Sequence, residues 1–492
     1  MRTSSYPPLR WAYAAGYGAI LLPVVARLRL TAEIRSVQIK LPGGPFCFGS
    51  SDIDLWGVVA PVSLPAFLAL CDRLSNLLEP QHALGRIIDL YLLSEAEAEL
   101  RGRIESQSSM SHRIRLTGAG QRLCRTEAGP EQSRLGRVMY RFMNMSRMVM
   151  RAPLDAHQAR ILSKSLLNID QEWRRQPSGF AGSPQYGAVI ATAYDSARGK
   201  LINPEGDAQA PGVLAAALEA ADAISVEFSA PSDKSGEFVP AEYAAAPMGL
   251  ELAIAKVRRP IDRLCADIGE MLSAVMLGGN PGFDYVWRTY FIVREGLSPA
   301  DRMKVFSWLA SAKVRDFFQR FSLGYPIVLT SSMWRSMHRW YHPDRPVEEF
   351  YFFKRHGISL WGEDLRDQLS APGREDVLRS AAISIAHIRS QLWRAVHAGQ
   401  ARHLSNLLLG RLPTLWLLLT RGVVATSSGE AMETVHAESL PHVEALASLH
   451  ATLRSLSPRE LPSTSESVWT PVLEKATEWI DAALESALRQ VH

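Results

Sequence analysis

Cysteine is scarce in this sequence. Only four cysteines occur among 492 residues, and no two of them have the C-x-x-C spacing of a zinc or redox site. Such scattered cysteines argue against a disulfide framework and a Cys/His zinc centre, and they favour a protein of a reducing cytoplasm.

Long apolar runs are missing as well. The stretch from Trp11 to Ala26 is apolar, but it contains Pro23 and lacks a clean small-residue cleavage site, so it predicts a core helix rather than a signal peptide. No run reaches the ~18 apolar residues that a membrane-spanning helix needs. We therefore expect no membrane partner.

Several widespread catalytic motifs are absent. The sequence contains no G-x-x-x-x-G-K-[ST] phosphate loop, no G-x-S-x-G elbow, no H-E-x-x-H and no G-x-G-x-x-G. These absences argue against P-loop nucleotide hydrolases, α/β hydrolases, zinc proteases and Rossmann dehydrogenases. No internal repeat and no long low-complexity tract is recognisable.

Positive charge is unevenly distributed. The net charge is only +4, but residues 101–160 hold twelve arginines against four acids. This excess favours a polyanionic partner such as RNA, or nucleotide phosphates. The whole chain has 45 Arg and only 9 Lys, as a GC-rich genome would give, so codon usage accounts for part of the excess.

The first hundred residues alternate between strand and helix signals. Residues 35–41 and 52–60 read as strands on either side of a Pro/Gly-rich turn, 64–79 repeat apolar residues at helical spacing, and 85–94 read as a third strand. This order is typical of a small mixed β-sheet backed by helices, so the expected fold class is α+β.

Two carboxylates interrupt the second of these strands. Asp52 and Asp54 stand within FCFGSSDIDLWGVV, and strand residues two apart face the same side of a sheet. Burying bare carboxylates is costly and two close together repel each other, so a divalent cation is the simplest compensation. Asp89, in the apolar strand GRIIDLYLLS, adds a third acid.

Three acids beside one sheet suit two-metal phosphoryl chemistry. One Mg²⁺ would hold a nucleoside triphosphate while the other lowers the pKa of an attacking hydroxyl, and Asp89 could accept the proton. The structural alternative is that the acids cap a turn and pair with arginines such as Arg86.

The segment Gly49-Ser50-Ser51-Asp52-Ile53-Asp54-Leu55, with Asp89 on a later strand, resembles the DNA-polymerase-β-type nucleotidyltransferase superfamily. The resemblance implies that Gly49, Ser50 and Ser51 bind nucleotide phosphates and that Asp52, Asp54 and Asp89 hold Mg²⁺, with ATP as the nucleotide donor. The family usually has about ten residues between Gly-Ser and D-x-D, whereas here the two motifs are adjacent.

A second resemblance lies downstream. EEFYFFKRHGISLWGEDLRDQL (348–369) is similar to the segment that joins the catalytic sheet to the helical domain in aminoglycoside nucleotidyltransferases of the streptomycin/spectinomycin type, although Glu363 stands where they have proline. In that family the last strand of the sheet precedes this segment. The resemblance therefore implies that 325–330 completes the first sheet and that most of 95–320 is an insertion.

Together these patterns predict a nucleotidyltransferase domain with a large inserted region and a mainly helical C-terminal domain. Four regions are expected: 1–100, the catalytic core; 101–250, a basic inserted region with strand-like runs at 187–194 and 223–230; 251–347, helical with one sheet strand near 325–330; and 348–492, the helical C-terminal domain.

The expected activity is Mg²⁺-dependent transfer of AMP from ATP to an acceptor hydroxyl, with release of pyrophosphate. The acceptor would be a small hydroxylated molecule, with RNA or a protein as competitors. The alternative is a catalytically inactive nucleotidyltransferase-like module with a role in binding or assembly.

Overall fold

The computed structural model describes part of the chain. The residues it describes are 7–40, 53–82, 88–95, 97–98, 113–117, 132–151, 154–174, 182–197, 206–228, 242–243, 250–278, 288–321, 323, 326–340, 347–374 and 411–425, with isolated positions between 377 and 388 and at 482 and 485. Most of the helical domain predicted for 348–492 lies outside these residues.

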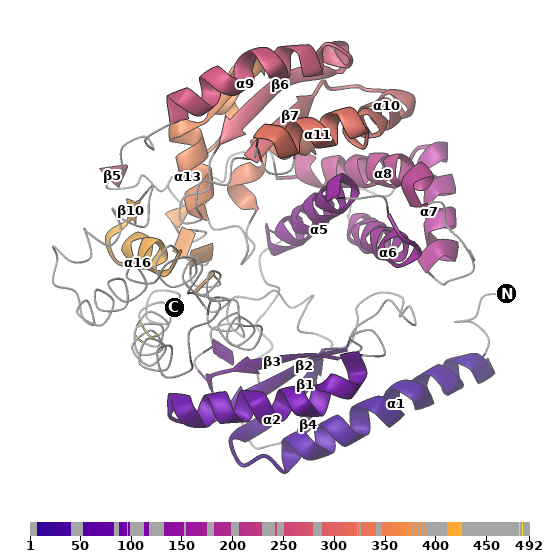
Figure 1. Ribbon diagram of the computed structural model, residues 1–492, viewed down its shortest axis with the longest axis vertical. Coiled ribbons are helices and arrows are strands. Elements are labelled where there is room, and N and C mark those ends of the chain that lie inside the picture. Colours follow the sequence, from indigo (N-terminus) through magenta and orange to yellow (C-terminus); the bar gives the residue numbers. More distant parts are fainter. Residues whose placement is uncertain are drawn as a thin grey trace. The chain divides into compact units, whose positions relative to one another are not determined.

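The chain forms two compact units, coloured along the sequence in Figure 1. The first comprises residues 1–130, 382–416 and 432–492, and the second comprises 131–381 and 417–431. Two of the predicted boundaries, near 250 and 347, fall inside the second unit. The fold is mixed α+β, with helices dominant and two four-stranded mixed sheets.

The first unit contains the predicted β-β-α-β segment. Its described elements are α1 (Pro7–Arg29), β1 (Ile34–Lys40), β2 (Ile53–Val59), α2 (Leu64–His82), β3 (Ile88–Leu93) and β4 (Arg113–Thr117). The strand order is β3-β2-β1-β4, in which β1 is antiparallel to both β2 and β4 while β2 is parallel to β3. The three strands and the helix predicted here are confirmed, as is a helix over Trp11 to Ala26.

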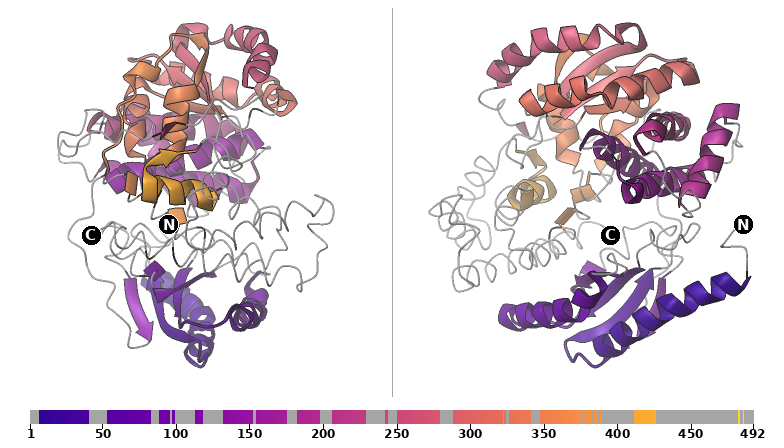
Figure 2. Two further views of the ribbon diagram at one scale, coloured as in Figure 1. Left: turned by 90° about the vertical axis from the view of Figure 1, so that its left-hand side faces the viewer. Right: turned by 45° about the vertical axis from the view of Figure 1, so that its right-hand side comes forward.

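Helices α1 and α2 cover one face of this sheet, as Figures 1 and 2 show. Leu28 of α1 and Leu70 of α2 are fully buried in one apolar cluster with Val37 and Leu55 of the sheet. These strand residues alternate with residues of the opposite face, which is the period-2 pattern that identified the strands.

The opposite face of the first sheet has a smaller apolar cluster. Trp56 lies beside Tyr91 of the neighbouring strand, with 6.5 Å between ring centroids, and Ala98 belongs to the same cluster. Directly after β3, Ser94 and Glu97 form a reciprocal capping box: the backbone N–H of Ser94 donates to Glu97 Oε2, and that of Glu97 donates to Ser94 Oγ.

The second unit begins with a layer of four packed helices. These are α5 (Gln132–Arg151), α6 (Ala156–Trp173), α7 (Pro184–Ala197) and α8 (Gly206–Val226). The prediction of a strand at 187–194 is wrong, because these residues belong to α7, and the strand predicted for 223–230 is wrong for 223–228, which form the end of α8 and a turn. Residues 229–230 lie outside the described part of the chain. The apolar residues of α7 are buried at helical spacing, as Tyr186, Ile190 and Ala193 show.

Beyond this layer lies the second sheet. Its elements are α9 (Leu250–Cys265), β6 (Leu272–Gly278), β7 (Arg288–Val293), α10 (Pro299–Leu309), α11 (Ala312–Phe321), β8 (Pro326–Leu329), α12 (Ser331–Arg335), α13 (Val347–His356) and β9 (Ile358–Gly362), with short 3-10 turns at Gly269–Met271, Met337–Arg339 and Arg366–Gln368. A two-residue parallel pair, β5 (Glu242–Tyr243) with β10 (Val423–Val424), and α16 (Leu412–Arg421) complete the described elements.

The second sheet has the order β8-β7-β6-β9. Three strands therefore lie in 251–347, where one was predicted, and the strand near 325–330 pairs with β7 rather than with the first sheet. The inference that most of 95–320 is an insertion into one sheet is wrong for the same reason. The order and strand directions match those of the first sheet.

Aromatic side chains fill both faces of the second sheet. On one face, Phe291 lies 5.6 Å from Trp308 of α10 and 6.1 Å from Phe318 of α11, measured between ring centroids. On the other face, Tyr290 lies 6.0 Å from Trp334 of α12 and 5.2 Å from Phe353 of α13. Adjacent positions of β7 thus point to opposite faces, and each face has its own helices.

Polar contacts fix the helical layer to this sheet. Arg302 of α10 forms an ion pair with Glu219 of α8 at 3.2 Å. Thr330, directly after β8, donates its hydroxyl hydrogen to Asp222 of α8 and accepts the backbone N–H of Met333, which caps α12. Burial raises the pKa of Asp222, and the hydrogen bond from Thr330 partly offsets this effect.

His338 is buried in the same unit, with 3% of its surface exposed. Its Nε2 accepts the Nε–H of Arg339, so Nδ1 carries the proton and donates to the carbonyl of Arg335 at 3.0 Å. Burial, and to a smaller extent the neighbouring Arg339 guanidinium, lower the pKa of His338 to about 4. The imidazole is therefore neutral in the folded protein at neutral pH.

This pKa makes stability depend on pH. The unfolded chain binds a proton at His338 near pH 6.5 while the folded chain does not bind it until about pH 4, so stability falls as pH falls through that window. Between about pH 7 and about pH 5 this residue should remove roughly 2 kcal/mol from the free energy of unfolding. Urea unfolding of the wild type and of His338→Gln at both pH values measures the effect. Equal pH dependence in the two proteins would contradict it.

Candidate functional site

The structure brings two of the three predicted acids into register. β2 and β3 are parallel neighbours, and their pairing sets the Cα of Asp54 opposite the Cα of Asp89. Paired strands lie about 4.8 Å apart, so the two positions are direct neighbours across the sheet. Both are the second residue of their strand, which puts them at one end of the sheet.

These two positions belong to the sheet face that α1 and α2 do not cover. Position 54 alternates with Leu55, which lies in the cluster under the helices, and shares its parity with Trp56 on the opposite face. Position 89 has the same relation to Leu90 and Tyr91. Positions 54 and 89 thus lie on one face and at one end of the sheet.

β1 adds polar positions to this face, a feature that the sequence interpretation missed. Lys40 is the register partner of Asp54 on β1, and Gln38 is the partner of Trp56. Gln38 and Ser36 are buried, with 5% and 3% of their surface exposed. The alternation in RSVQIKL could have revealed this set, because Ser36, Gln38 and Lys40 share one parity.

The other predicted site residues lie outside the described part of the chain. These are Gly49, Ser50, Ser51 and Asp52, and the side chains of Asp54 and Asp89 are likewise not described. Phosphate binding by the Gly-Ser segment and the participation of Asp52 therefore stay predictions. Among the side chains that are described, no group of three or more His, Cys, Asp or Glu is arranged to hold a metal ion.

The donor chemistry at positions 54 and 89 fits Mg²⁺. This ion prefers oxygen ligands, is usually held by one or two protein carboxylates, and keeps several waters. Two carboxylate residues paired on adjacent strands offer such ligands.

The arginine-rich segment is only partly described, and part of it is engaged within the protein. Arg137 of α5 forms an ion pair with Glu172 of α6 at 3.6 Å. Just beyond the segment, Arg174 donates to the buried Asp170 at 2.8 Å, and Tyr186 donates to the same carboxylate at 2.9 Å. These contacts hold the helical layer together and so reduce the charge available to a polyanion.

Comparison with known proteins does not assign this chain to a family. No helix among the described residues combines the length and apolar character needed to cross a membrane. Neither a known family model nor a curated protein sequence matches the chain.

Proposed function

We propose that the first unit catalyses Mg²⁺-dependent nucleotidyl transfer, moving AMP from ATP to an acceptor hydroxyl with release of pyrophosphate. The observation that carries the proposal is the register of Asp54 with Asp89 on adjacent parallel strands. Acids from segments about 35 residues apart in the sequence are neighbours in the sheet, as a shared metal site requires.

The residues have distinct roles in this proposal. Mg²⁺, when bound, would neutralise the phosphate charge and lower the pKa of the acceptor hydroxyl. Asp54 and Asp89, with Asp52, would hold the ion, and Asp89 would also accept the proton of the attacking hydroxyl. Gly49, Ser50 and Ser51 would hold the triphosphate through backbone N–H groups. Lys40, the register partner of Asp54, would add a positive charge near the phosphates.

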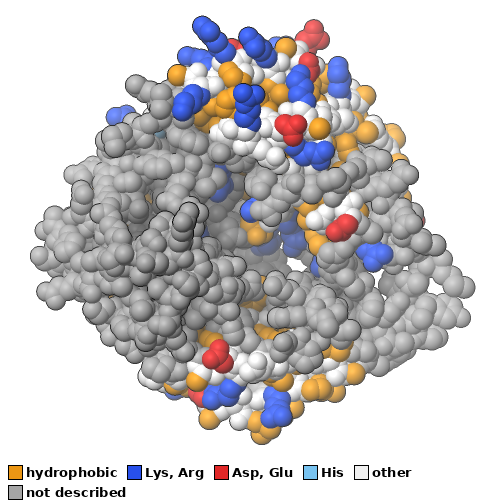
Figure 3. Space-filling view, in the orientation of Figure 1, with side chains coloured by type: hydrophobic (Ala, Val, Ile, Leu, Met, Phe, Trp, Pro, Cys, Tyr) orange, Lys and Arg blue, Asp and Glu red, His pale blue; other side chains and the backbone are white. Residues whose placement is uncertain are grey.

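The acceptor would be a small hydroxylated molecule, with RNA or a protein as the competing possibilities. Lys and Arg side chains gather over α9 to α11 in Figure 3, but they belong to the second unit and stand among acids. Lys313 of α11, for example, forms an ion pair with Asp267 at 2.6 Å. This mixture of charges gives no specific support to a nucleic-acid acceptor.

Replacement of the paired acids tests the proposal. Asp54→Asn and Asp89→Asn each remove one carboxylate oxygen ligand and should lower turnover by roughly 10²–10⁴-fold. The assay incubates the protein with labelled ATP, Mg²⁺ and fractionated cell extract, and follows transfer of label and release of pyrophosphate. Asp72, an exposed acid on α2, provides the matched control, and Asp72→Asn should keep full activity.

The same variants distinguish the hypothesis of an enzyme from that of a catalytically inactive module. Calorimetry with ATP and Mg²⁺ should give binding that is lost in Asp54→Asn. Binding without turnover on any fraction would favour the non-catalytic module, and full turnover in Asp89→Asn would remove this residue from the mechanism.

A further inference from the structure

The two four-stranded sheets repeat one arrangement of elements. In each, a helix precedes an antiparallel strand pair, a helical connection leads to a third strand parallel to the second, and a fourth strand pairs antiparallel with the first. The elements of the first set are α1-β1-β2-α2-β3-β4 (Figure 1). Those of the second are α9-β6-β7-α10-α11-β8-α12-α13-β9, in which α12 and α13 stand between the third and fourth strands.

The register of the strands agrees as closely as their order. Val37 pairs with Gly57 in the first sheet, and Val275 pairs with Phe291 in the second. Counted from these pairs, the irregularities coincide: the β1–β2 pairing shifts between Ile34 and Ser36, and the β6–β7 pairing shifts between Leu272 and Ala274. Strand order alone recurs in unrelated folds, but matching bulges are specific features of a strand pair.

The fourth strands share a sequence motif at matching register. His112 begins HRIRLTG and His356 begins HGISLWG, which both read H-x-I-x-L-x-G. In the first sheet Ile114 pairs with Ile39, and in the second Ile358 pairs with the equivalent Leu277.

The last residue of the second motif, Gly362, has φ 72°, and a Cβ there would overlap the carbonyl oxygen of Ser273. Glycine is therefore required at this position.

The third strands end in the same way. Leu93 and Leu329 are equivalent, since they pair with the equivalent residues Val58 and Ile292. Each is followed by a hydroxyl residue, Ser94 or Thr330, that accepts a backbone N–H three residues later. Two sheets thus agree in topology, bulges, a terminal motif and a capping position.

We infer that the segment from α9 to β9 is a second copy of the unit from α1 to β4, and that this copy holds neither a metal ion nor a nucleotide. The register sets Arg288 where the first copy has Asp54. Counted along the sequence from these strands, Tyr325 takes the place of Asp89 and Val286 takes the place of Asp52. Arginine, tyrosine and valine supply no carboxylate ligand.

The corresponding face of the second copy is also filled. Tyr290 is equivalent to Trp56, and Trp334 is equivalent to Ala98, so a small residue of the first copy is replaced by an indole. Trp334 is fully buried, and its ring centroid lies 5.2 Å from that of Phe353. A Cβ added to Gly278 would overlap the Phe353 ring, so α13 lies directly against β6.

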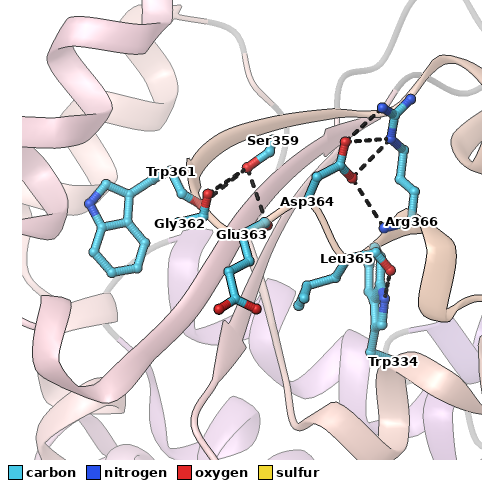
Figure 4. Close-up of polar contacts among 8 residues, drawn as sticks. All are labelled: Trp334, Ser359, Trp361, Gly362, Glu363, Asp364, Leu365 and Arg366. Atoms are coloured by element: carbon cyan, nitrogen blue, oxygen red, sulfur yellow. Dashed lines mark hydrogen bonds and ion pairs between the residues drawn. The ribbon is translucent and has the colours of Figure 1, made fainter.

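A hydrogen bond fixes the indole in this position. The Nε1–H of Trp334 donates to the carbonyl oxygen of Leu365 at 2.8 Å, and Figure 4 shows the indole beside that carbonyl while Trp361 points away from it. The segment is held further by Arg366, which donates to Asp364. Substrate entry at this face would require displacement of a buried, hydrogen-bonded tryptophan.

The inference goes beyond the proposed function and does not depend on it. It assigns a packing role to the second sheet and predicts that any metal or nucleotide binding belongs to the first. The chain would then have one centre, in one of two related units.

Binding of Mn²⁺ and Mn²⁺–ATP to the full chain tests this inference. Matched double variants remove equivalent positions: Asp54→Asn/Asp89→Asn in the first copy and Arg288→Ala/Tyr325→Phe in the second. The first pair should weaken binding at least ~100-fold, while the second should change it less than about twofold. Binding that survives in the first pair and is lost in the second would overturn the inference.

The experiment keeps the two proposals separate. If the wild type binds no Mn²⁺–ATP, the proposed function fails, while the absence of a site in the second copy is upheld. If it binds and only the first pair abolishes binding, both stand. Electron paramagnetic resonance of bound Mn²⁺ reports the number of sites without any activity assay.

A second measurement tests the filled face. Trp334→Ala should lower the thermal midpoint by about 6–20 °C, because it leaves a large cavity in a packed core, and should leave Mn²⁺–ATP affinity unchanged. Trp361→Ala, a partly exposed tryptophan of β9, is the matched control and should cost much less. An unchanged midpoint in Trp334→Ala, or altered nucleotide affinity, would show that this face is a site rather than core.

Discussion

The parallel pairing of β2 with β3 is the constraint on which the proposed chemistry depends. Helix α2 connects β2 to β3 and brings the chain back to the end of the sheet where β2 begins. Residues from two segments therefore become neighbours at that end. The apolar residues of both strands are held under α1 and α2, which fixes the register. A slip of one residue would move Asp54 and Asp89 to the covered face, so the packing of the core also sets the position of the acids.

The sequence predicted the first sheet well because each strand alternates between a covered and an open face. It failed where periodicity was ambiguous. The small residues of α7 and α8 read as strands, although their buried positions follow helical spacing. The strands β6 and β7 are buried on both faces, so they lack alternation. The Gly-Ser segment and Asp52 lie outside the described residues, so for them the sequence remains the only guide.

The sequence did not reveal the relation between the two copies, because the copies agree in strand register rather than in residue identity. Gly57 corresponds to Phe291 and Ala98 to Trp334, which are large changes in volume at equivalent positions. Outside the H-x-I-x-L-x-G motif, identical residues such as Val37 and Val275 are scattered singly along the strands. A sheet face without carboxylates can be covered by aromatic side chains without burying a charge. Burial of such rings stabilises the fold.

Thr330 connects three parts of the second unit through one hydroxyl group, since it follows β8, caps α12 and donates to Asp222. The end of β8, the start of α12 and helix α8 therefore all depend on this one hydroxyl group. A displacement of any one of them would break bonds made by the other two. This arrangement favours concerted loosening of the sheet and the helices over independent fraying at their margins.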